Sequence, residues 1–346
     1  MNEVFKIVFN TRPNQSFHFG NFSYYVETAL DDTSNILHSD TLFSSIINLF
    51  ASIYGEDDTK EVINYFENGN LLVSSGFYEL ESKGNKIQFY PKPITANLFE
   101  VTDVKKLKRI AFVSAGILKN GILPANWFTE SCVIIDNEFA CTNEEWQTLT
   151  NKKSEKFRIY NKQLLTKTKV RKESDDDDSL YTQLNLVFTD NTLSDINTNL
   201  FAYIQINDVP EMDINKLRNV IMSLRDEGVG GERNTSGSNF LNVQLEQLAH
   251  NMFSGEMYLS LSLTLPVAED LSNHLYYKII QRGGRRANIG GRLKYVRMLA
   301  EGAIADKIIK GSIVNISPNI DEIILRYGKP FCIPISKAFN PIVNES

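Results

Sequence analysis

Two glycine-rich stretches in the second half of the chain have the residue types that hold a phosphate. The first is residues 228–237, Gly-Val-Gly-Gly-Glu-Arg-Asn-Thr-Ser-Gly. It lacks the Gly-Lys-Ser/Thr end of a Walker loop, and it follows a helical pattern where a dinucleotide fingerprint follows a strand. Glycines let the backbone approach a phosphate closely, and free amides donate to its oxygens. The stretch therefore indicates either a phosphate-binding loop or a flexible connector.

The second stretch is residues 283–292, Gly-Gly-Arg-Arg-Ala-Asn-Ile-Gly-Gly-Arg. Guanidinium groups bind phosphates through two parallel hydrogen bonds, and glycines would let the arginines reach around a strand. Residues 281–297 hold six Lys or Arg and no acidic residue. A cationic binding segment and a disordered one both fit this composition.

A third candidate is the run Leu-His-Ser-Asp-Thr-Leu-Phe at residues 37–43. Ser39 fits the N-cap of a helix, whose exposed amides would attract an anion. His38, Ser39 and Asp40 are adjacent, so they do not form a catalytic triad, which needs groups from different elements. An ordinary capped helix explains these residues equally well. His38 is also the candidate general base if the chain were a metal-free ribonuclease.

Charge is distributed unevenly along the chain. The formal net charge is −6, which argues against a protein that binds nucleic acid through charge alone. Residues 152–172, however, hold nine Lys or Arg and one acid, and four aspartates follow at 175–178. The basic run and the alternating residues 180–184 predict a protruding hairpin. Such a distribution suits a subunit that binds RNA on one face and protein elsewhere, although solvated loops would look the same.

Other classes of protein receive little support. No run of about 18 apolar residues suggests a membrane span, and the N-terminal residues do not resemble a secretory signal. The three cysteines form no C-x-x-C pair, so a reducing, cytoplasmic location is expected. The four histidines show no metal-binding spacing, so neither a metal nor another cofactor is expected.

Hydrophobic periodicity predicts an α+β fold of two ferredoxin-like modules, each with the order β-α-β-β-α-β. The expected divisions are an N-terminal module at 1–115, a linker with a thumb-like basic insertion at 116–199, and a C-terminal module at 200–346. The elements expected in the first module are strands at 4–9, 71–80, 86–90 and 110–113 and helices at 39–53 and 103–109. Those expected in the second are strands at 201–206, 240–248, 257–265 and 276–281, a helix that Asp213 caps and that ends at Gly228, and a short helix at 267–275.

Several of these segments, in this order, resemble the RAMP superfamily of CRISPR proteins. They are His-Ser-Asp-Thr-Leu-Phe at 38–43, Tyr-Pro-Lys-Pro at 90–93, the glycine-rich loop at 228–237, Leu-Ala-Glu-Gly-Ala at 299–303 and Arg-Tyr-Gly-Lys-Pro-Phe at 326–331. The combination is most similar to the subunit that caps the 5′ tag of the guide RNA in type III-A (Csm) effector complexes. The chain departs from that family in the hairpin, where Lys-Val-Arg-Lys at 169–172 replaces an Ile-Asp-Arg pattern.

The resemblance implies a subunit without catalytic activity that binds the 5′ repeat-derived tag of the CRISPR guide RNA, and target RNA near it. It also implies contacts with a large polymerase-type subunit and a backbone RAMP subunit. The residues expected to contact RNA are His38, Ser39, Asp40, Lys167, Lys169, Arg171, Gly228, Gly230, Gly231, Arg233, Asn234, Ser236, Gly237, Arg285, Arg286 and Arg292. Three alternatives stay open: a guide-processing endoribonuclease of the same superfamily, the equivalent subunit of a type III-B complex, and an adaptor without RNA contacts.

Overall fold

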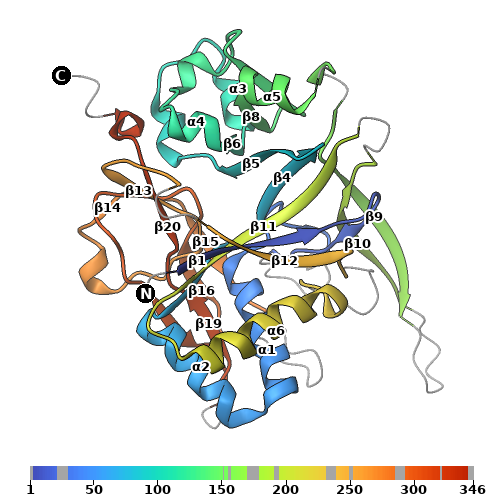
Figure 1. The fold of residues 1–346 in the computed structure, drawn as a ribbon, viewed down its shortest axis with the longest axis vertical. Helices are drawn as coiled ribbons and strands as arrows, with labels where there is room; N and C mark the ends of the chain where they lie inside the picture. Colours follow the sequence, from blue (N-terminus) through green and yellow to red (C-terminus); the bar gives the residue numbers. More distant parts are fainter. Residues whose placement is uncertain are drawn as a thin grey trace.

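The computed structural model has an α+β fold built around a nine-stranded mixed sheet (Figure 1). Helices cover one side of this sheet, and smaller sheets formed by the C-terminal residues pack beside it. The structure describes residues 3–21, 30–150, 152–154, 157–169, 179–190, 195–230, 239–248, 252–284, 293–319 and 322–341.

One ferredoxin-like module forms the centre of the large sheet. Strand β1 (Glu3–Asn10) lies between β11 (Asn197–Ile206) and β12 (Asn242–Gln247) and is antiparallel to both. On its other edge β11 pairs with β4 (Phe77–Ser82) and with the short β3 (Leu71–Val73). In chain order the neighbours are therefore the fourth, first, third and second strands, which is the ferredoxin-like arrangement.

The module's helices pack on one face of the sheet. Helix α1 (Ser39–Tyr54) follows β1, α2 (Glu56–Asn68) comes next, and α6 (Glu211–Glu227) connects β11 to β12. Figure 1 shows all three below the sheet, with α1 against α6. Helix α1 buries Leu42, Phe43, Ile46 and Phe50 as one stripe, and it ends at Gly55, whose positive φ of 85° favours glycine.

This topology corrects the predicted division of the chain. Strands β1 and β11 were expected in different modules, at 1–115 and 200–346, yet they pair along the full length of β1. The second half of the ferredoxin-like module is therefore supplied by β11, α6 and β12, and residues 83–196 lie between its second and third strands. Alternating apolar residues mark the buried face of a strand but not its neighbour, so the sequence left the pairing open.

The C-terminal residues form smaller sheets instead of the predicted second module. One sheet contains β13 (Met257–Ser260), β14 (His274–Tyr276), β17 (Ile304–Ala305) and β20 (Cys332–Ile335). Two further antiparallel ribbons pair β15 (Ile279–Arg282) with β16 (Val296–Leu299), and β18 (Ser312–Asn315) with β19 (Leu325–Gly328). The helix expected at 267–275 is a single 3-10 turn, Ala268–Asp270, and the strand expected at 257–265 ends after Ser260.

The segment between β4 and β11 extends the large sheet and then leaves it. Strands β5 (Asn85–Pro91), β6 (Phe112–Ser114), β8 (Phe139–Thr142) and β7 (Cys132–Ile135) continue the sheet beyond β4. Short helices cover this end, at the top of Figure 1. They are α3 (Val104–Arg109), α4 (Ala115–Lys119) and α5 (Asn143–Leu149), with 3-10 turns at Ile94–Leu98 and Pro124–Asn126; a further turn, Lys337–Phe339, follows β20.

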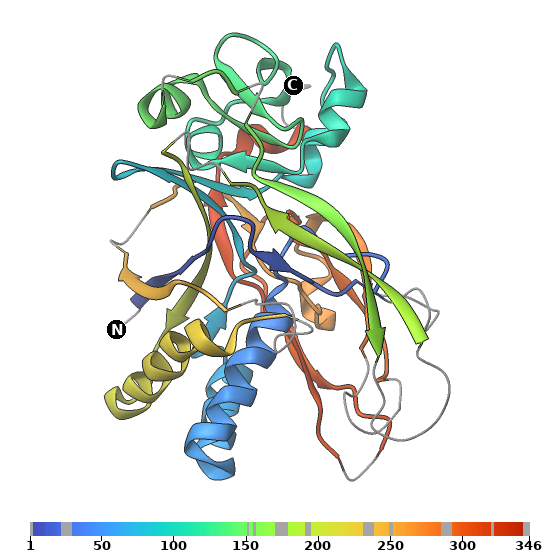
Figure 2. The ribbon, with the colours of Figure 1, turned by 90° about the vertical axis from the view of Figure 1, so that its right-hand side faces the viewer.

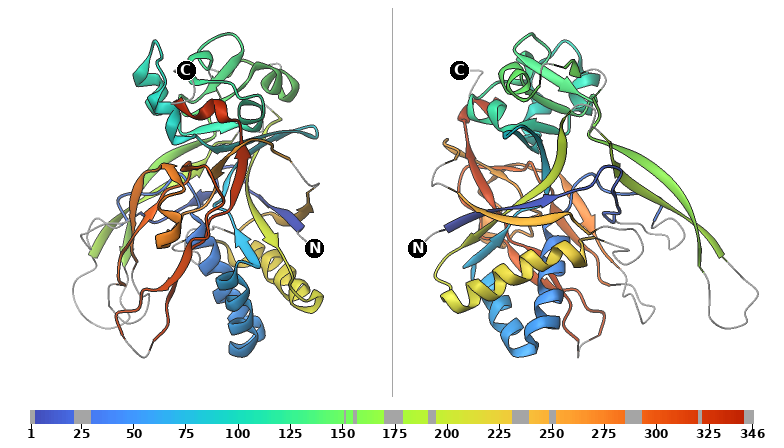
Figure 3. Two further views of the ribbon diagram at one scale, coloured as in Figure 1. Left: turned by 90° about the vertical axis from the view of Figure 1, so that its left-hand side faces the viewer. Right: turned by 45° about the vertical axis from the view of Figure 1, so that its right-hand side comes forward.

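A long hairpin completes this segment. Strands β9 (Tyr160–Lys169) and β10 (Ser179–Phe188) pair antiparallel over their whole length, and β2 (Ser16–Phe17) adds to the edge of β10. Figure 2 shows the hairpin in front of the central sheet, and the right-hand view of Figure 3 shows it projecting beyond the rest of the molecule. Its base is thus joined to the N-terminal residues, while its far end lies away from the core.

Candidate nucleic-acid interface

Three segments that the sequence singled out meet at residues 18–20. The His18 ring nitrogen Nδ1 lies 2.9 Å from the carbonyl oxygen of Leu184 in the hairpin. The carbonyl oxygen of His18 itself lies against Gly230 in the glycine-rich loop, where an added Cβ would be 2.9 Å away. The carbonyl oxygen of Gly20 accepts a hydrogen bond of 2.8 Å from Nη1 of Arg282, directly before the glycine-arginine stretch.

Both described ends of the glycine-rich loop lie on the segment after β1. Gly228 ends helix α6 with φ 75°, and Gly230 has φ 92°, so both occupy a backbone region that favours glycine. Beyond the loop, the carbonyl oxygen of Asn239 accepts hydrogen bonds from Arg12 and Gln15. The RNA contacts expected of Gly228 and Gly230 stay a prediction. Gly231, Arg233, Asn234, Ser236 and Gly237 lie outside the described residues, and their RNA contacts stay a prediction.

The glycine-arginine stretch begins at a buried ion-pair cluster. Arg282 donates two hydrogen bonds to the Asp40 carboxylate, Nε to Oδ2 at 3.0 Å and Nη2 to Oδ1 at 2.9 Å. Nη1 of Arg326 donates to the same carboxylate, and its Nη2 donates to the carbonyl oxygen of Gly283 at 3.0 Å. These bonds fix the point where the stretch leaves the core. Arg285, Arg286 and Arg292 lie outside the described residues.

The electrostatics of Asp40 follow from this cluster. Burial alone would raise the pKa of its carboxyl group, because a low-dielectric interior disfavours the charged form. The guanidinium of Arg282, followed by that of Arg326, more than offsets this effect and holds the pKa of Asp40 well below its usual range. Asp40 is therefore charged, and the two buried guanidiniums neutralise its charge inside the protein.

His38 belongs to a second buried cluster, which joins helix α1 to the C-terminal residues. Its Nδ1 lies 2.8 Å from Oε1 of Glu301, and its Nε2 lies 3.1 Å from the hydroxyl of Ser34. The hydroxyl of Ser75 also donates to Glu301 and accepts from the Ser39 amide at 2.8 Å. Burial would raise the pKa of Glu301, but the contact with His38 outweighs it and lowers the pKa.

These two clusters correct the predicted role of the helix start. His38, Ser39 and Asp40 are only 6%, 0% and 1% exposed, and the groups expected to face RNA bond to other parts of the protein. The N-cap is His38, not Ser39, and Ser39 is the first helical residue. The Ser75 hydroxyl accepts from the Ser39 amide, a group predicted to bind an external anion. In this structure the three residues position neighbouring segments and do not reach the surface.

Ser34, His38 and Glu301 are linked in the order of a serine-hydrolase triad. None of the three is more than 9% exposed, so the Ser34 hydroxyl is buried. We interpret the cluster as structural: the contact between His38 and Glu301 holds the start of α1 against the loop after β16.

The hairpin carries polar atoms that the sequence analysis partly missed. Lys167 lies on β9 opposite Tyr181, and Gln183 and Asn185 follow on the same face of β10. Among the described residues, Nζ of Lys167, both amide atoms of Gln183 and Oδ1 of Asn185 are buried without a hydrogen-bond partner. The alternation of residues 181, 183 and 185, of which only Tyr181 pairs with Lys167, would have indicated this row. Lys169 ends β9, and Arg171 lies outside the described residues.

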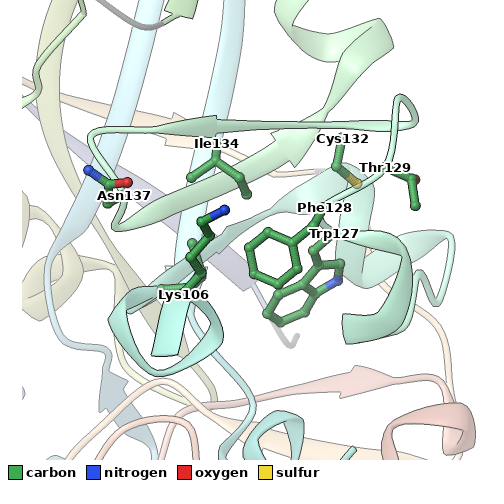
Figure 4. A pocket seen from close by; sticks show the side chains of 8 residues that line it. Lys106, Trp127, Phe128, Thr129, Cys132, Ile134 and Asn137 are labelled. Carbon is green, nitrogen blue, oxygen red and sulfur yellow. The ribbon is translucent and has the colours of Figure 1, made fainter. Parts of the chain in front are cut away.

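A separate cavity of about 320 Å³ lies in the segment between β4 and β11 (Figure 4). Trp127, Phe128 and Cys132 line it together with Lys106 of α3. No residue predicted to bind RNA lines it. Within the described ranges, no group of His, Cys, Asp or Glu could hold a metal ion, and no helix is long and apolar enough to cross a membrane. The aspartate run at 175–178 falls outside those ranges.

Comparisons with known proteins bear on these observations. Residues 254–335 match the CRISPR Csm4 C-terminal domain family. A protein of Methanocaldococcus jannaschii described as "CRISPR system Cms protein Csm4" is 26% identical over 392 residues, which cover 97% of each chain.

Solved structures share the fold. A chain of the Csm3-Csm4 subcomplex of a type III-A CRISPR-Cas interference complex superposes with a TM-score of 0.69 at 22% identity, covering 96% of this chain and 99% of that one. A chain of a Csm1-Csm4 cassette in complex with cA4 gives a TM-score of 0.54 at 15% identity, covering 97% and 98%. The family match over residues 254–335 and the relative that spans nearly the whole chain agree with the resemblance carried by the motifs, and the solved structures show that the chain shares their fold.

Proposed function

We propose that this chain binds the 5′ repeat-derived tag of a CRISPR guide RNA as a non-catalytic subunit of a type III-A interference complex. The observation that carries the proposal is the meeting of three segments at residues 18–20. The hairpin, the glycine-rich loop and Arg282, directly before the glycine-arginine stretch, are far apart in sequence, yet each contacts this one short segment.

The proposed site would hold single-stranded RNA mainly by its backbone. Amides of the glycine-rich loop and the guanidiniums of Arg233, Arg285, Arg286 and Arg292 suit phosphate oxygens. The hairpin projects beyond the body, so its basic residues would meet the guide and the target RNA next to the tag. Because phosphate contacts release counterions, binding should weaken as salt rises.

The proposed partners are those with which the solved relatives assemble. Relatives of this fold occur in a Csm3-Csm4 subcomplex and in a Csm1-Csm4 cassette. We extend this to the present chain, as contacts with a backbone RAMP subunit and with a large polymerase-type subunit of a cytoplasmic ribonucleoprotein.

The burial of His38 argues against the guide-processing ribonuclease alternative. A general base must reach the 2′-hydroxyl it deprotonates, whereas both ring nitrogens of His38 face Glu301 and Ser34 inside the protein. Incubation of the isolated chain with repeat RNA should leave that RNA intact. Cleavage that disappears in His38→Ala would instead favour the ribonuclease.

The direct test is a titration of the full chain with an oligonucleotide of the tag sequence at several salt concentrations. The double variant Arg285→Ala, Arg286→Ala should bind more weakly, and the slope of log affinity against log salt should shrink by about 1.4, because each lost phosphate contact removes about 0.7 for a single strand. A matched control is Lys105→Ala, Lys108→Ala on α3, which removes two exposed cations from another region. Unchanged affinity and slope in the arginine variant would remove this stretch from the site.

A further inference from the structure

The outward face of the β15–β16 ribbon carries large side chains in solvent. On the inner face Arg282 and Met298 are buried, and Arg282 is held by Asp40. On the outer side Tyr277, Ile279 and Tyr295 are 51%, 55% and 55% exposed. Strand register pairs Gln281 with Arg297 on this same outer face, and Arg297 is also exposed. The ribbon therefore has one anchored face and one face that exposes these three side chains, although Leu299, opposite Ile279 on the outer face, is buried.

The sequence of this segment carries only positive charge. Residues 271–300 contain seven Lys or Arg and no Asp or Glu. Arg297 lies on the outer face with the tyrosines and is exposed, whereas the alternation of side chains places Lys278 and Lys294, also exposed, on the other face with Arg282. Tyrosines also occur in protein interfaces, but a face with aromatic rings on both sides of a cation, in a segment without acids, matches the alternating bases and phosphates of unpaired RNA.

The ribbon is also long enough for several nucleotides. Its backbone pairing continues past both strands, from the Ala300 amide bonded to Lys278 at 2.8 Å to the Leu293 amide bonded to Gly284 at 3.1 Å. Tyr277 and Tyr295 lie at opposite ends of this paired length, with Arg297 between them. At about 3.3 Å per residue, the two rings are separated by roughly 20 Å along the ribbon.

We infer that this face is a stacking surface for unpaired nucleotides, with Tyr277 and Tyr295 as ring platforms and Arg297 holding a phosphate between them. The inference rests on the proposed binding of guide RNA. It adds to that site a surface on which bases stack against aromatic side chains. Stacking of this kind tolerates any base, because every base has an aromatic face. Fixing the ribbon through Arg282 and Asp40 would hold the rings in place before RNA arrives.

The test uses the full chain and a single-stranded RNA of the tag sequence, with 2-aminopurine at successive positions. Replacing both tyrosines by alanine should weaken binding about fivefold to 150-fold for each base that stacks. The salt slope should not change, because no phosphate contact is lost. Quenching of 2-aminopurine at the stacked positions should disappear as well.

Matched variants separate stacking from other causes. Tyr277→Phe with Tyr295→Phe keeps both rings and should retain affinity and quenching. Arg297→Ala should lower the salt slope by about 0.7 and leave the quenching in place. Thermal unfolding of all variants should stay close to that of the unchanged chain, since the altered side chains are half exposed.

Three results would overturn the inference. If the double alanine variant binds RNA with full affinity while the Arg285→Ala, Arg286→Ala variant binds it weakly, the stacking surface is rejected and the proposed function stands. If the double alanine variant binds RNA with full affinity but does not assemble with the other subunits, the face is a docking surface for protein. If the unchanged chain binds no single-stranded RNA, the proposed function fails, and the stacking surface with it.

Discussion

At the scale of single residues, Asp40 and its two arginines carry the most structural consequence. The carboxylate is buried at the start of α1 and neutralises guanidiniums from β15 and β19. Removing one member of a buried ion pair leaves the other charges uncompensated, which commonly costs about 3–5 kcal/mol. The cluster is therefore expected to hold the C-terminal ribbons against the ferredoxin-like module.

We predict that Asp40→Asn lowers the free energy of unfolding by about 3 kcal/mol at neutral pH. Chemical denaturation of the full chain measures this change. Asp57→Asn is the matched control, because Asp57 forms only an exposed ion pair with Lys60, which is worth little. Equal stability of the two variants would show that Asp40 is not an anchor.

The pH dependence of the same pair of proteins has a defined sign. The pKa of Asp40 is depressed in the folded state, so its contribution to stability is present above the unfolded pKa of about 3.9 and is lost as the pH falls further. The stability difference between the unchanged chain and Asp40→Asn should hence be constant from pH 5 to 7 and should shrink below about pH 4. A difference that persists undiminished at pH 2 to 3 would contradict this assignment.

At the scale of elements, the base of the glycine-rich loop depends on close backbone approach. Gly230 has a φ of 92°, and the His18 carbonyl oxygen lies 2.9 Å from the position that a Cβ at residue 230 would take. Gly84, in the turn between β4 and β5, has a similar φ of 86° but nothing within 4 Å of an added Cβ. The two glycines therefore separate the cost of the backbone conformation from the cost of the contact.

We predict that Gly230→Ala destabilises the chain more than Gly84→Ala. Both substitutions carry the left-handed backbone cost of about 1–2 kcal/mol, and only Gly230→Ala also displaces the His18 carbonyl. Thermal or chemical unfolding compares the two directly. If the alanine variants are equally stable, residues 18–20 do not hold the loop as described.

Periodicity predicted most elements of the ferredoxin-like module, because its strands and helices bury one continuous face each. The helix after Ser39 and its end at Gly55 are confirmed, as are the strands at 4–9 and 201–206. Pairing was not predictable in the same way. Nothing in β1 specifies that β11, almost 200 residues later, lies beside it, since alternation gives a face and not a partner.

The site shows the same limit. The sequence selected His38, Ser39 and Asp40 as polar residues at a helix start, where exposed amides attract anions. Their actual partners, Glu301, Ser75 and Arg282, lie 36 to 263 positions away in sequence. Local spacing cannot reveal such partners. The sequence analysis also did not select Tyr277 and Tyr295, because their exposure depends on which side of the ribbon faces the core.

At the scale of the whole molecule, the candidate interface is assembled from both ends and the middle of the chain. Residues 12–20 lie between the hairpin base and the glycine-rich loop, and Arg282 brings the C-terminal ribbon to the same place. Tyr327 of β19 stacks on Phe43 of α1 at 5.1 Å, which fixes that arrangement from inside. The short helices α3 to α5 lie at the end of the molecule opposite to helices α1, α2 and α6 (Figure 1).

The most direct measurement is photo-crosslinking in the assembled effector complex, with 4-thiouridine placed at each position of the guide RNA tag and the linked peptides identified by mass spectrometry. We predict crosslinks from tag positions to peptides of this chain that contain the hairpin, residues 228–247 or residues 276–300. Tag crosslinks confined to other subunits, or to the α3–α5 end of this chain, would contradict the account.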